Sequence, residues 1–423
     1  MDPNQQPAGE PAENAKRDSR ARLPRRGLLF GGAAAGLGAL AAAGAQLAGA
    51  AQQDGAPAAP SGDAVHGGGT VPFYGTRQAG ITTAAQAHGV FVALDLRPGT
   101  TRDGIRALLR LLTDDAANLT AGEPALADTE AELAQVPARL TVTFGFGPGL
   151  LAAVDPARAP AWLQPLPAFT VDRLQPGYSD GDLLLQICAD DPLTVAHAQR
   201  MLLKDSRSFA TVRWVQTGFR RSYGSEKPGT TMRNLFGQVD GTTNPAPDSA
   251  EHERVVWGGG DTPAWTENGT SVVIRRIAMN LDKWDEVDRV AREESVGRRL
   301  SNGAPLTGTQ EHDEPNFAAV SKLGFPVISD VSHLRRARPE DGSQRIFRRA
   351  YNYDEPPGSG GISDSGLIFV SYQADVERQF TPIQRRLDEM DMLNQWTTPI
   401  GSAVFAVPPG CREGGFIGEG LFA

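Results

Sequence analysis

The sequence predicts an α+β fold with two ferredoxin-like halves, the first with the order strand, helix, strand, strand, helix, strand. Stretches typical of strands and helices alternate from about residue 90 to the C-terminus. The alternation occurs twice, before and after a loop in which an aspartate stands between glycines. The length of 423 residues is enough for two domains of ordinary size. We therefore expect antiparallel sheet packed by helices.

The first half contains the clearer pattern. Runs of Val, Leu and Phe predict its strands, and apolar residues spaced three or four apart predict its helices. The strands are expected at 90–96, 140–147, 182–189 and 209–219, and the helices at 102–119 and 192–203.

The second half repeats this order around a long irregular stretch that carries His312 and His333. Strands are expected at 271–281, 366–372 and 403–407, and helices at 282–300 and 376–392. The expected division of the chain is a signal segment at 1–50, a flexible linker at 51–69, an N-terminal domain at 70–245 and a C-terminal domain at 246–423.

The N-terminal segment has the pattern of an export signal. Arg25 and Arg26 precede a run of Ala, Gly and Leu at 31–50 that ends in small residues. Adjacent arginines before a weakly apolar run are typical of a twin-arginine signal peptide, with cleavage expected after Ala50. A transmembrane anchor is the alternative, because the run approaches membrane-spanning length. We expect export by the twin-arginine translocase to the periplasm or the extracellular space.

Charge and cysteine content argue against two classes of function, nucleic-acid binding and covalent attachment of a c-type haem. The net charge is -9 and no long basic tract occurs, so we expect no nucleic-acid binding. Cys188 and Cys411 are the only cysteines, and the absence of CxxCH excludes covalent c-type haem attachment. Cys188 lies in an apolar run typical of a buried thiol, and a disulfide between the two cysteines stays open.

The loop between the two halves is the first candidate site. It reads NLFGQVDGTTNP at 234–245, with Asp240 between Gly237 and Gly241. Glycines let a tight loop turn sharply and present one carboxylate to a pocket. An ordinary Asp-Gly turn is the alternative, so the loop needs a chemical partner elsewhere. His333, which arginines follow, is the candidate partner.

Together these segments resemble the dye-decolorizing (Dyp-type) haem peroxidases, in particular the exported EfeB/deferrochelatase-like group. The resemblance implies the dimeric α/β-barrel superfamily fold, and its segments follow the family order from about residue 66 to the C-terminus. They are PFYG at 72–75, QAGI at 78–81, GQVDG at 237–241, HLRRARP at 333–339, RRAYNY at 348–353 and GLIFVSYQ at 366–373.

The resemblance implies a peroxidase with non-covalent haem b (iron protoporphyrin IX). Such an enzyme uses hydrogen peroxide to oxidise dyes, phenols or other organic reductants through a ferryl intermediate. His333 matches the proximal iron ligand and Asp240 the distal proton shuttle. Arg348 and Arg349 compete for the distal arginine, because neighbours on a strand face opposite sides. Arg348 is slightly favoured.

The family pattern implies further cofactor contacts. Arg338-Pro339 stands where the family often has Asn-Pro, which puts a contact near the haem edge in doubt. His312 lies in an acidic loop, which favours a channel wall over a metal site. The implied haem contacts are Gly237 and Gly241 in the distal loop, Arg335 or Arg336 at a propionate, Leu367 and Phe369 over the distal face, and Asp391 as hydrogen-bond acceptor for His333.

Alternative functions stay open at this level. A haem-binding or deferrochelatase component of an iron-uptake system would need the same haem-binding residues. A chlorite-dismutase-like activity is disfavoured by the aspartate loop. The resemblance also leaves a homo-oligomer open. Bulky reductants could pass electrons through surface aromatic residues, for which the candidates are Trp214, Tyr351, Tyr353 and Trp396.

Overall fold

The computed structural model describes residues 66–257, 262–339, 341–358 and 361–423. The expected signal segment and most of the expected linker lie outside these residues. The described chain begins before residue 70, because His66–Gly68 already forms a 3-10 helix. The carbonyl oxygens of Gly67 and Gly69 accept hydrogen bonds from the backbone of Ala138 and Arg139. Within the described residues, no helix is long and apolar enough to cross a membrane.

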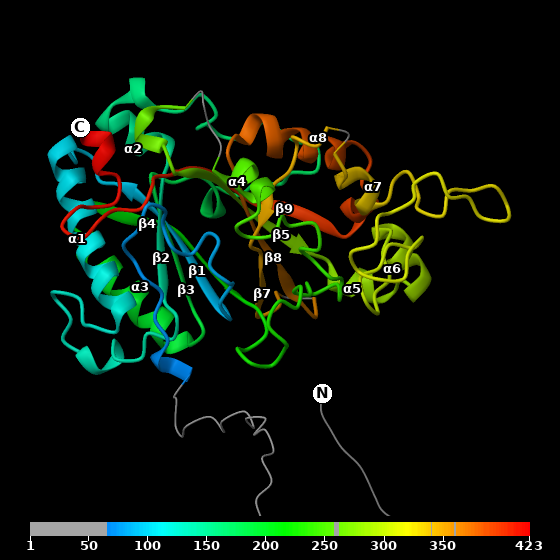
Figure 1. The fold of residues 1–423 in the computed structure, drawn as a ribbon, viewed down its shortest axis with the longest axis horizontal. Helices are drawn as coiled ribbons and strands as arrows, with labels where there is room; N and C mark the ends of the chain where they lie inside the picture. The colour runs from blue at the N-terminus through cyan, green and yellow to red at the C-terminus, as the bar shows by residue number, and fades with distance from the viewer. Residues whose placement is uncertain (1–65, 258–261, 340, 359–360) are drawn as a thin grey trace, which may run out of the picture. The chain divides into compact units, whose positions relative to one another are not determined.

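The strands form one antiparallel sheet that closes on itself (Figure 1). Their order is β5-β9-β2-β3-β1-β4-β7-β8-β6, and β5 also pairs with β8, which completes a ring. The strands are β1 (His88–Leu96), β2 (Thr141–Phe146), β3 (Leu183–Ala189), β4 (Ala210–Phe219), β5 (Thr270–Met279), β6 (Phe347–Arg348), β7 (Tyr351–Glu355), β8 (Asp364–Gln373) and β9 (Thr397–Val407).

The ring consists of two ferredoxin-like halves with the same strand order. The N-terminal half runs β2-β3-β1-β4 and the C-terminal half runs β7-β8-β5-β9. Within each half the first and third strands are central, which confirms the fold class expected from the sequence. The halves meet at single register pairs, Phe146 with Ala406 and Phe219 with Asn352.

Two long helices cover the outer face of the N-terminal half (Figure 1). They are α1 (Arg102–Ala121) and α3 (Pro192–Ser206). The Thr101 side chain caps the start of α1 and Gly122, at φ 84°, ends it in the left-handed conformation. The apolar side of α1 packs on the outward side chains of β1 and β2 in a continuous core. The shorter α2 (Pro148–Val154) extends this cover.

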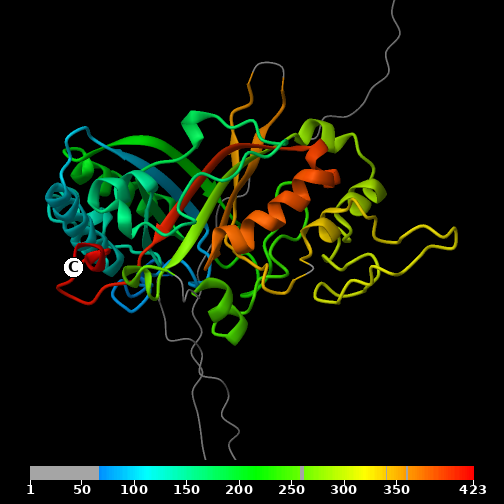
Figure 2. The same ribbon diagram turned by 90° about the horizontal axis from the view of Figure 1, so that it is seen from above.

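The C-terminal half departs from the sequence expectation in its helices. The expected helix at 282–300 is two short helices, α5 (Leu281–Asp285) and α6 (Arg289–Val296), and the expected helix at 376–392 begins with a π-helical turn at Val376–Phe380. A long loop between α6 and α7 projects from the body, drawn yellow in Figures 1 and 2. The remaining helices are α4 (Ala250–Val256), α7 (His333–Ala337) and α8 (Thr381–Met390).

Candidate active site

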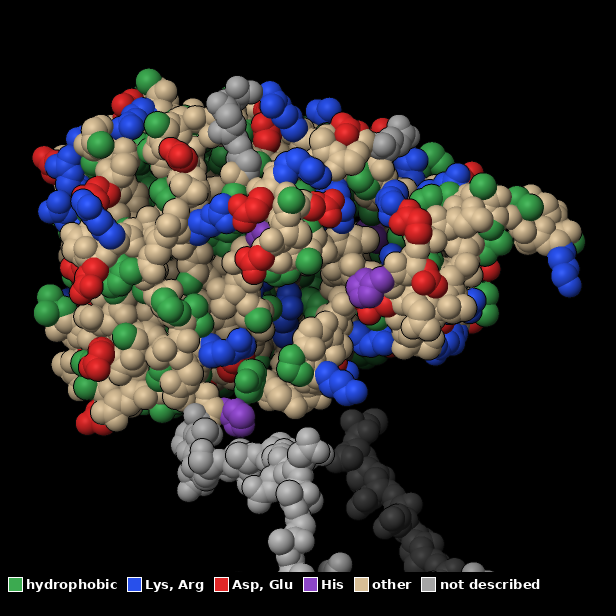
Figure 3. Space-filling model, in the orientation of Figure 1, with side chains coloured by type: hydrophobic (Ala, Val, Ile, Leu, Met, Phe, Trp, Pro, Cys, Tyr) green, Lys and Arg blue, Asp and Glu red, His purple; other side chains and the backbone are tan. Residues whose placement is uncertain are grey.

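A cavity of about 920 Å³ lies on the outer face of the C-terminal half. Its walls come from β5, β8, α7, α8 and the aspartate loop. In the space-filling view the surface is hollowed near the middle of the molecule, and Lys or Arg, Asp or Glu and hydrophobic side chains all lie around the hollow (Figure 3). The volume is at the upper end of the roughly 300–1,000 Å³ typical of ligand pockets, so the cavity is large enough for a cofactor.

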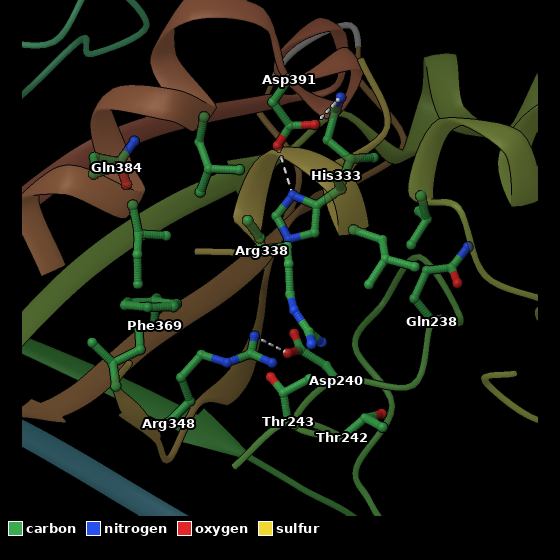
Figure 4. A pocket seen from close by; sticks show the side chains of 18 of the residues that line it. Gln238, Asp240, Thr242, Thr243, His333, Arg338, Arg348, Phe369, Gln384 and Asp391 are labelled. Carbon is green, nitrogen blue, oxygen red and sulfur yellow. Dashed lines mark hydrogen bonds and ion pairs between the residues drawn. The ribbon is translucent and has the colours of Figure 1, made fainter. Parts of the chain in front are cut away.

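His333 enters this cavity from the first turn of α7. Its Nδ1 lies 2.6 Å from Oδ2 of Asp391, which follows α8 and is buried. The backbone N–H of Leu393 donates to the other oxygen of Asp391 at 3.0 Å, so the carboxylate is held from two sides. Figure 4 shows the imidazole with Nε2 turned into the cavity. An imidazole fixed by a carboxylate in this way is a typical metal ligand.

Two opposed effects set the pKa of His333. Burial lowers it, but the charge of Asp391 and the hydrogen bond between the two side chains outweigh burial and raise the pKa above its ordinary value. Asp391 therefore attracts a proton or a metal ion to the ring. The sequence had placed an acid here only through the family resemblance, and the structure brings the two residues into contact.

Asp240 lies across the cavity from His333, in the loop that divides the two halves (Figure 4). Gly237 at φ 78° and Gly241 at φ 128° adopt backbone conformations that other residues rarely enter. The N–H of Asp240 donates to the carbonyl oxygen of Met232 at 2.8 Å, which fixes the loop. Gly241 lines the cavity, whereas Gly237 shapes the loop behind it.

Arg348 and Arg349 point to opposite faces, as the strand geometry predicts. The Nη1 of Arg348 donates to Oδ1 of Asp240 at 2.5 Å, and Arg348 lines the cavity. Arg349 is buried on the other face and donates to the carbonyl oxygen of Thr83 and to the side chain of Gln86. Arg348 is therefore the arginine that stands beside the aspartate.

Apolar side chains of two paired strands form one wall. Leu367 and Phe369 of β8 line the cavity, as the sequence predicts, and Leu367 pairs in register with Ile277 of β5. Sequence reasoning missed Ile277 and Met279, which line the same wall. Their alternation along β5 was the available signal.

Arg335 and Arg336, expected at a cofactor carboxylate, do not line the cavity. Arg335 donates to the carbonyl oxygen of Phe317 and pairs with Asp330 at 3.0 Å. Arg336 donates to the carbonyl oxygen of Arg386 and pairs with Glu389. Both guanidinium groups fasten α7 to its neighbours, so the structure gives no support to either as a cofactor contact.

His312 is a solvent-exposed side chain, and both cysteines are buried free thiols. His312 is 73% exposed beside Glu311, and the described residues contain no cluster that could hold a metal ion. Cys188 and Cys411 are free and buried, so no disulfide joins them. Burial raises the pKa of both thiols, to about 11 for Cys411. Neither thiol is a candidate nucleophile.

Three of the four aromatic residues proposed as surface relays are buried: Trp214, Tyr351 and Tyr353. Trp396 is partly exposed. Its ring centroid lies 5.1 Å from that of Trp284, which in turn lies 4.4 Å from Phe236 on the cavity wall. Trp284, which the sequence gave no reason to single out, thus connects Trp396 with the cavity.

Two family models match most of the chain. The one described as "Dyp-type peroxidase, N-terminal" matches residues 78–220, and the one described as "Dyp-type peroxidase, C-terminal" matches residues 231–412. The boundary between them falls just before the aspartate loop.

Curated relatives and solved structures agree with these matches. The chain is 40% identical to a dye-decolorizing peroxidase of Thermobifida fusca, over 81% of this chain and 83% of the relative. It is 35% identical to the deferrochelatase of Escherichia coli K12, over 81% and 84% of the two chains. The crystal structure of a DyP-type peroxidase from Cellulomonas bogoriensis is similar with a TM-score of 0.83 and 55% identity, covering 85% of this chain and 99% of that one.

Proposed function

The chain belongs to the Dyp-type peroxidase family and is a haem peroxidase that uses hydrogen peroxide to oxidise organic reductants, and on this premise we propose roles for His333, Asp240 and Arg348. His333 holds the haem iron, while Asp240 and Arg348 act on the peroxide. The single observation that supports these roles is the arrangement of two pairs across one cavity, His333 with Asp391 and Asp240 with Arg348.

The residues of the cavity fit haem. An imidazole whose Nδ1 is fixed by Asp391 offers Nε2 to an iron ion. The wall of Ile277, Leu367 and Phe369 suits the apolar face of a flat ring, and arginines at the cavity lining suit its carboxylates. Haem, when bound, supplies the iron at which the peroxide O–O bond is cleaved.

Asp240 is placed to move a proton. With haem bound, its carboxylate would accept a proton from one peroxide oxygen and return it to the other, which would leave as water. The guanidinium group of Arg348 stabilises the negative charge that develops on the leaving oxygen. The hydrogen bond between the two side chains orients the carboxylate before the peroxide arrives.

Replacement of Asp240 tests this role. We expect Asp240→Ala to bind haem with an unchanged Soret band and to lower peroxide turnover with a phenol or dye about 10²–10⁴-fold, as loss of acid–base catalysis does. Asp103→Ala, which removes an exposed acid of α1, is the control and should leave turnover unchanged. If Asp240→Ala turned over peroxide at the wild-type rate, the proposed role of Asp240 in proton transfer would be wrong.

A haem-handling role in iron uptake is the second candidate, because curated relatives are named deferrochelatases. The same cavity would then present haem for removal of its iron. Incubation of the holoprotein with a reductant, followed by separate assays for free iron and metal-free porphyrin, distinguishes the two. Release of both without peroxide supports the second candidate, and intact haem with rapid peroxide turnover supports the first.

Export by the twin-arginine translocase is a further proposal, supported by Arg25, Arg26 and the apolar run that follows them. This proposal concerns residues outside the described structure. Replacing both arginines by lysine should retain the protein in the cytoplasm, as cell fractionation and immunoblotting would detect. Assembly into a homo-oligomer stays a prediction that light scattering on the mature protein would test.

A further inference from the structure

Six arginines belong to the described lining of the cavity, but they differ in how firmly they are held. In four of them, a carboxylate or backbone carbonyl oxygens bind the guanidinium group. These ion pairs and hydrogen bonds leave the four side chains little freedom to bind a ligand. The four are Arg275 with Asp172, Arg298 with the carbonyl oxygens of Gly303 and Glu311, Arg345 with Glu251, and Arg348 with Asp240.

Arg338 is held much less firmly. Its side chain is 40% exposed, and its ion-pair partner Glu314, at 2.5 Å, is 72% exposed. Exposed ion pairs contribute about 0–1 kcal/mol, so another carboxylate can replace Glu314 at little cost. The sixth arginine, Arg254, is still more exposed, and it lies on α4, away from the helix that carries His333.

The position of Arg338 relates it directly to the haem site. It caps the C-terminal end of α7, the short helix that begins with His333. Figure 4 shows its side chain running from the His333 side of the cavity toward Asp240. Because Arg338 lines the same cavity as His333 and Asp240, a group bound between these two residues shares the cavity with this guanidinium group.

The charges around Arg338 favour an added anion. Burial lowers the pKa of Arg298, and the positive charges of Arg348 and Arg338 lower it further, whereas the negative charges of Glu311 and Glu314 raise it. A carboxylate brought among these three guanidinium groups relieves their repulsion. Arginine also binds a carboxylate through two parallel hydrogen bonds, which lysine or asparagine does not reproduce.

We propose that Arg338 binds one of the two haem carboxylates and that Glu314 competes with haem for the same guanidinium group. The pair is then a latch: Arg338 holds Glu314 when the cavity is empty and a haem carboxylate when it is filled. Arg338 takes the place that the sequence had assigned to Arg335 or Arg336. The inference rests on the proposed haem site and adds the residues that set how long haem is retained.

Haem release provides a test that does not depend on peroxidase activity. The holoprotein is mixed with excess apomyoglobin, and the rate of haem transfer is followed by the shift of the Soret band. We expect Arg338→Asn to release haem about tenfold faster, because a charge-assisted hydrogen bond is lost. We expect Glu314→Gln to release haem more slowly than the wild type, because the competitor for Arg338 is removed.

A matched pair on the surface serves as the control. Arg200 and Glu130 form a 2.7 Å ion pair, 53% and 45% exposed, in the N-terminal half. Arg200→Asn and Glu130→Gln should release haem at the wild-type rate. The same measurements are made on protein reconstituted with haem dimethyl ester, whose carboxylates carry no charge, and Arg338→Asn should then have no effect.

Three outcomes overturn the inference. Wild-type release by Arg338→Asn would show that the arginine does not hold haem. An equal effect of Arg338→Asn on haem and on its dimethyl ester would show that a carboxylate is not involved. Faster release by Glu314→Gln would show that the ion pair supports the fold. Failure of the wild type to bind haem at all would instead overturn the proposed function, and the latch with it.

Discussion

The two halves of the sheet share one strand order, but they use the outer face differently. In the N-terminal half, α1 and α3 cover this face, and their buried side chains share one hydrophobic core with those of the strands. In the C-terminal half, the outward side chains of β5 and β8 border the cavity. The same topology thus supports a closed core on one side and an open cavity on the other.

The lengths of the covering helices explain the difference. The helix after the first strand has 20 residues in the N-terminal half, whereas α5 and α6 have five and eight in the C-terminal half. Two short helices cannot cover a strand of ten residues such as β5. The chain between α6 and β7 fills part of the gap and carries α7 with His333.

Each half also contains one histidine–aspartate pair. In the N-terminal half, Nε2 of His197 on α3 lies 2.8 Å from Asp128, and both side chains are almost fully buried. In the C-terminal half, the His333 side chain is 34% exposed, because its ring opens on the cavity. The first pair can only join two segments of the fold, whereas the second can also bind a ligand.

Removing each imidazole should give the largest contrast between the halves. We expect His333→Ala to lose the Soret band and peroxide turnover, because the iron loses its protein ligand. His197→Ala should keep both and unfold more easily, because Asp128 is left buried without its partner. Absorption spectra and thermal melts of the two purified variants check this. A normal Soret band in His333→Ala would contradict the ligand assignment.

Truncating one leucine in each half should lower the free energy of unfolding more at the closed face than at the face that borders the cavity. Leu112→Ala removes a fully buried side chain of α1 and should lower the free energy of unfolding by about 2–5 kcal/mol. Leu367→Ala should lower it less, because that side chain already borders the cavity. Urea unfolding of the haem-free proteins measures both. Equal losses would indicate that the cavity wall is packed as tightly as the closed core.

Replacing Asp391 and Asp128 compares the two histidine–aspartate pairs by a smaller change than removal of the imidazoles. Asp391→Asn leaves a side chain of similar shape without charge and should weaken haem binding about 10–100-fold, the usual effect of a partner behind a metal ligand. Asp128→Asn should leave haem affinity unchanged. Titration of the haem-free variants with hemin gives both affinities. An equal loss of haem affinity in the two variants would mean that a general change of the fold, and not the loss of the bond to His333, weakens haem binding.

The smallest expected effect is a pH dependence confined to the N-terminal half. Burial and a hydrogen bond with Asp205 raise the pKa of Asp115 to about 7. The raised pKa means that the folded state holds this proton more tightly than the unfolded chain does, so stability is greatest at acid pH and decreases as the pH rises through about 7.

Thermal melts at pH 6 and pH 8 test this expectation. The melting temperature of the wild type should fall by a few degrees between them, and Asp115→Asn should reduce that fall. The Soret spectrum should not change over this range in either protein, because Asp115 lies in the closed core of α1. An identical fall in the variant would show that other groups cause it.

Predictions from the sequence were most accurate where periodicity is strong. The expected helix at 102–119 is α1 at Arg102–Ala121, and the expected strand at 182–189 is β3 at Leu183–Ala189. The expected helix at 282–300 was wrong, because the segment forms α5 and α6: the Asp288 side chain caps the start of α6, and Gly297, at φ 85°, ends it. Both caps are local signals, which the prediction of one continuous helix did not use.

For the site, the sequence supplied residue types and the resemblance supplied their order. The resemblance selected His333 and Asp240. The alternation of side chains along a strand indicated that only one of Arg348 and Arg349 could face the site. The resemblance assigned a carboxylate contact to Arg335 or Arg336, which the structure places outside the cavity lining. Arg335 and Arg338 are both arginines that follow His333, and only the direction of each side chain distinguishes them.

The sequence by itself thus determined the α+β fold class with two ferredoxin-like halves, the family, the haem cofactor and the two residues that face each other across the cavity. These features follow from periodicity and from short motifs, which are local properties of the chain. Only the tertiary structure decided which of Arg348 and Arg349 stands beside Asp240 and which guanidinium group remains weakly paired at the cavity, and it brought Asp391, the acid that the resemblance implied, into contact with His333. These depend on contacts between residues as far apart in the chain as Asp240 and Arg348, which local sequence patterns do not specify.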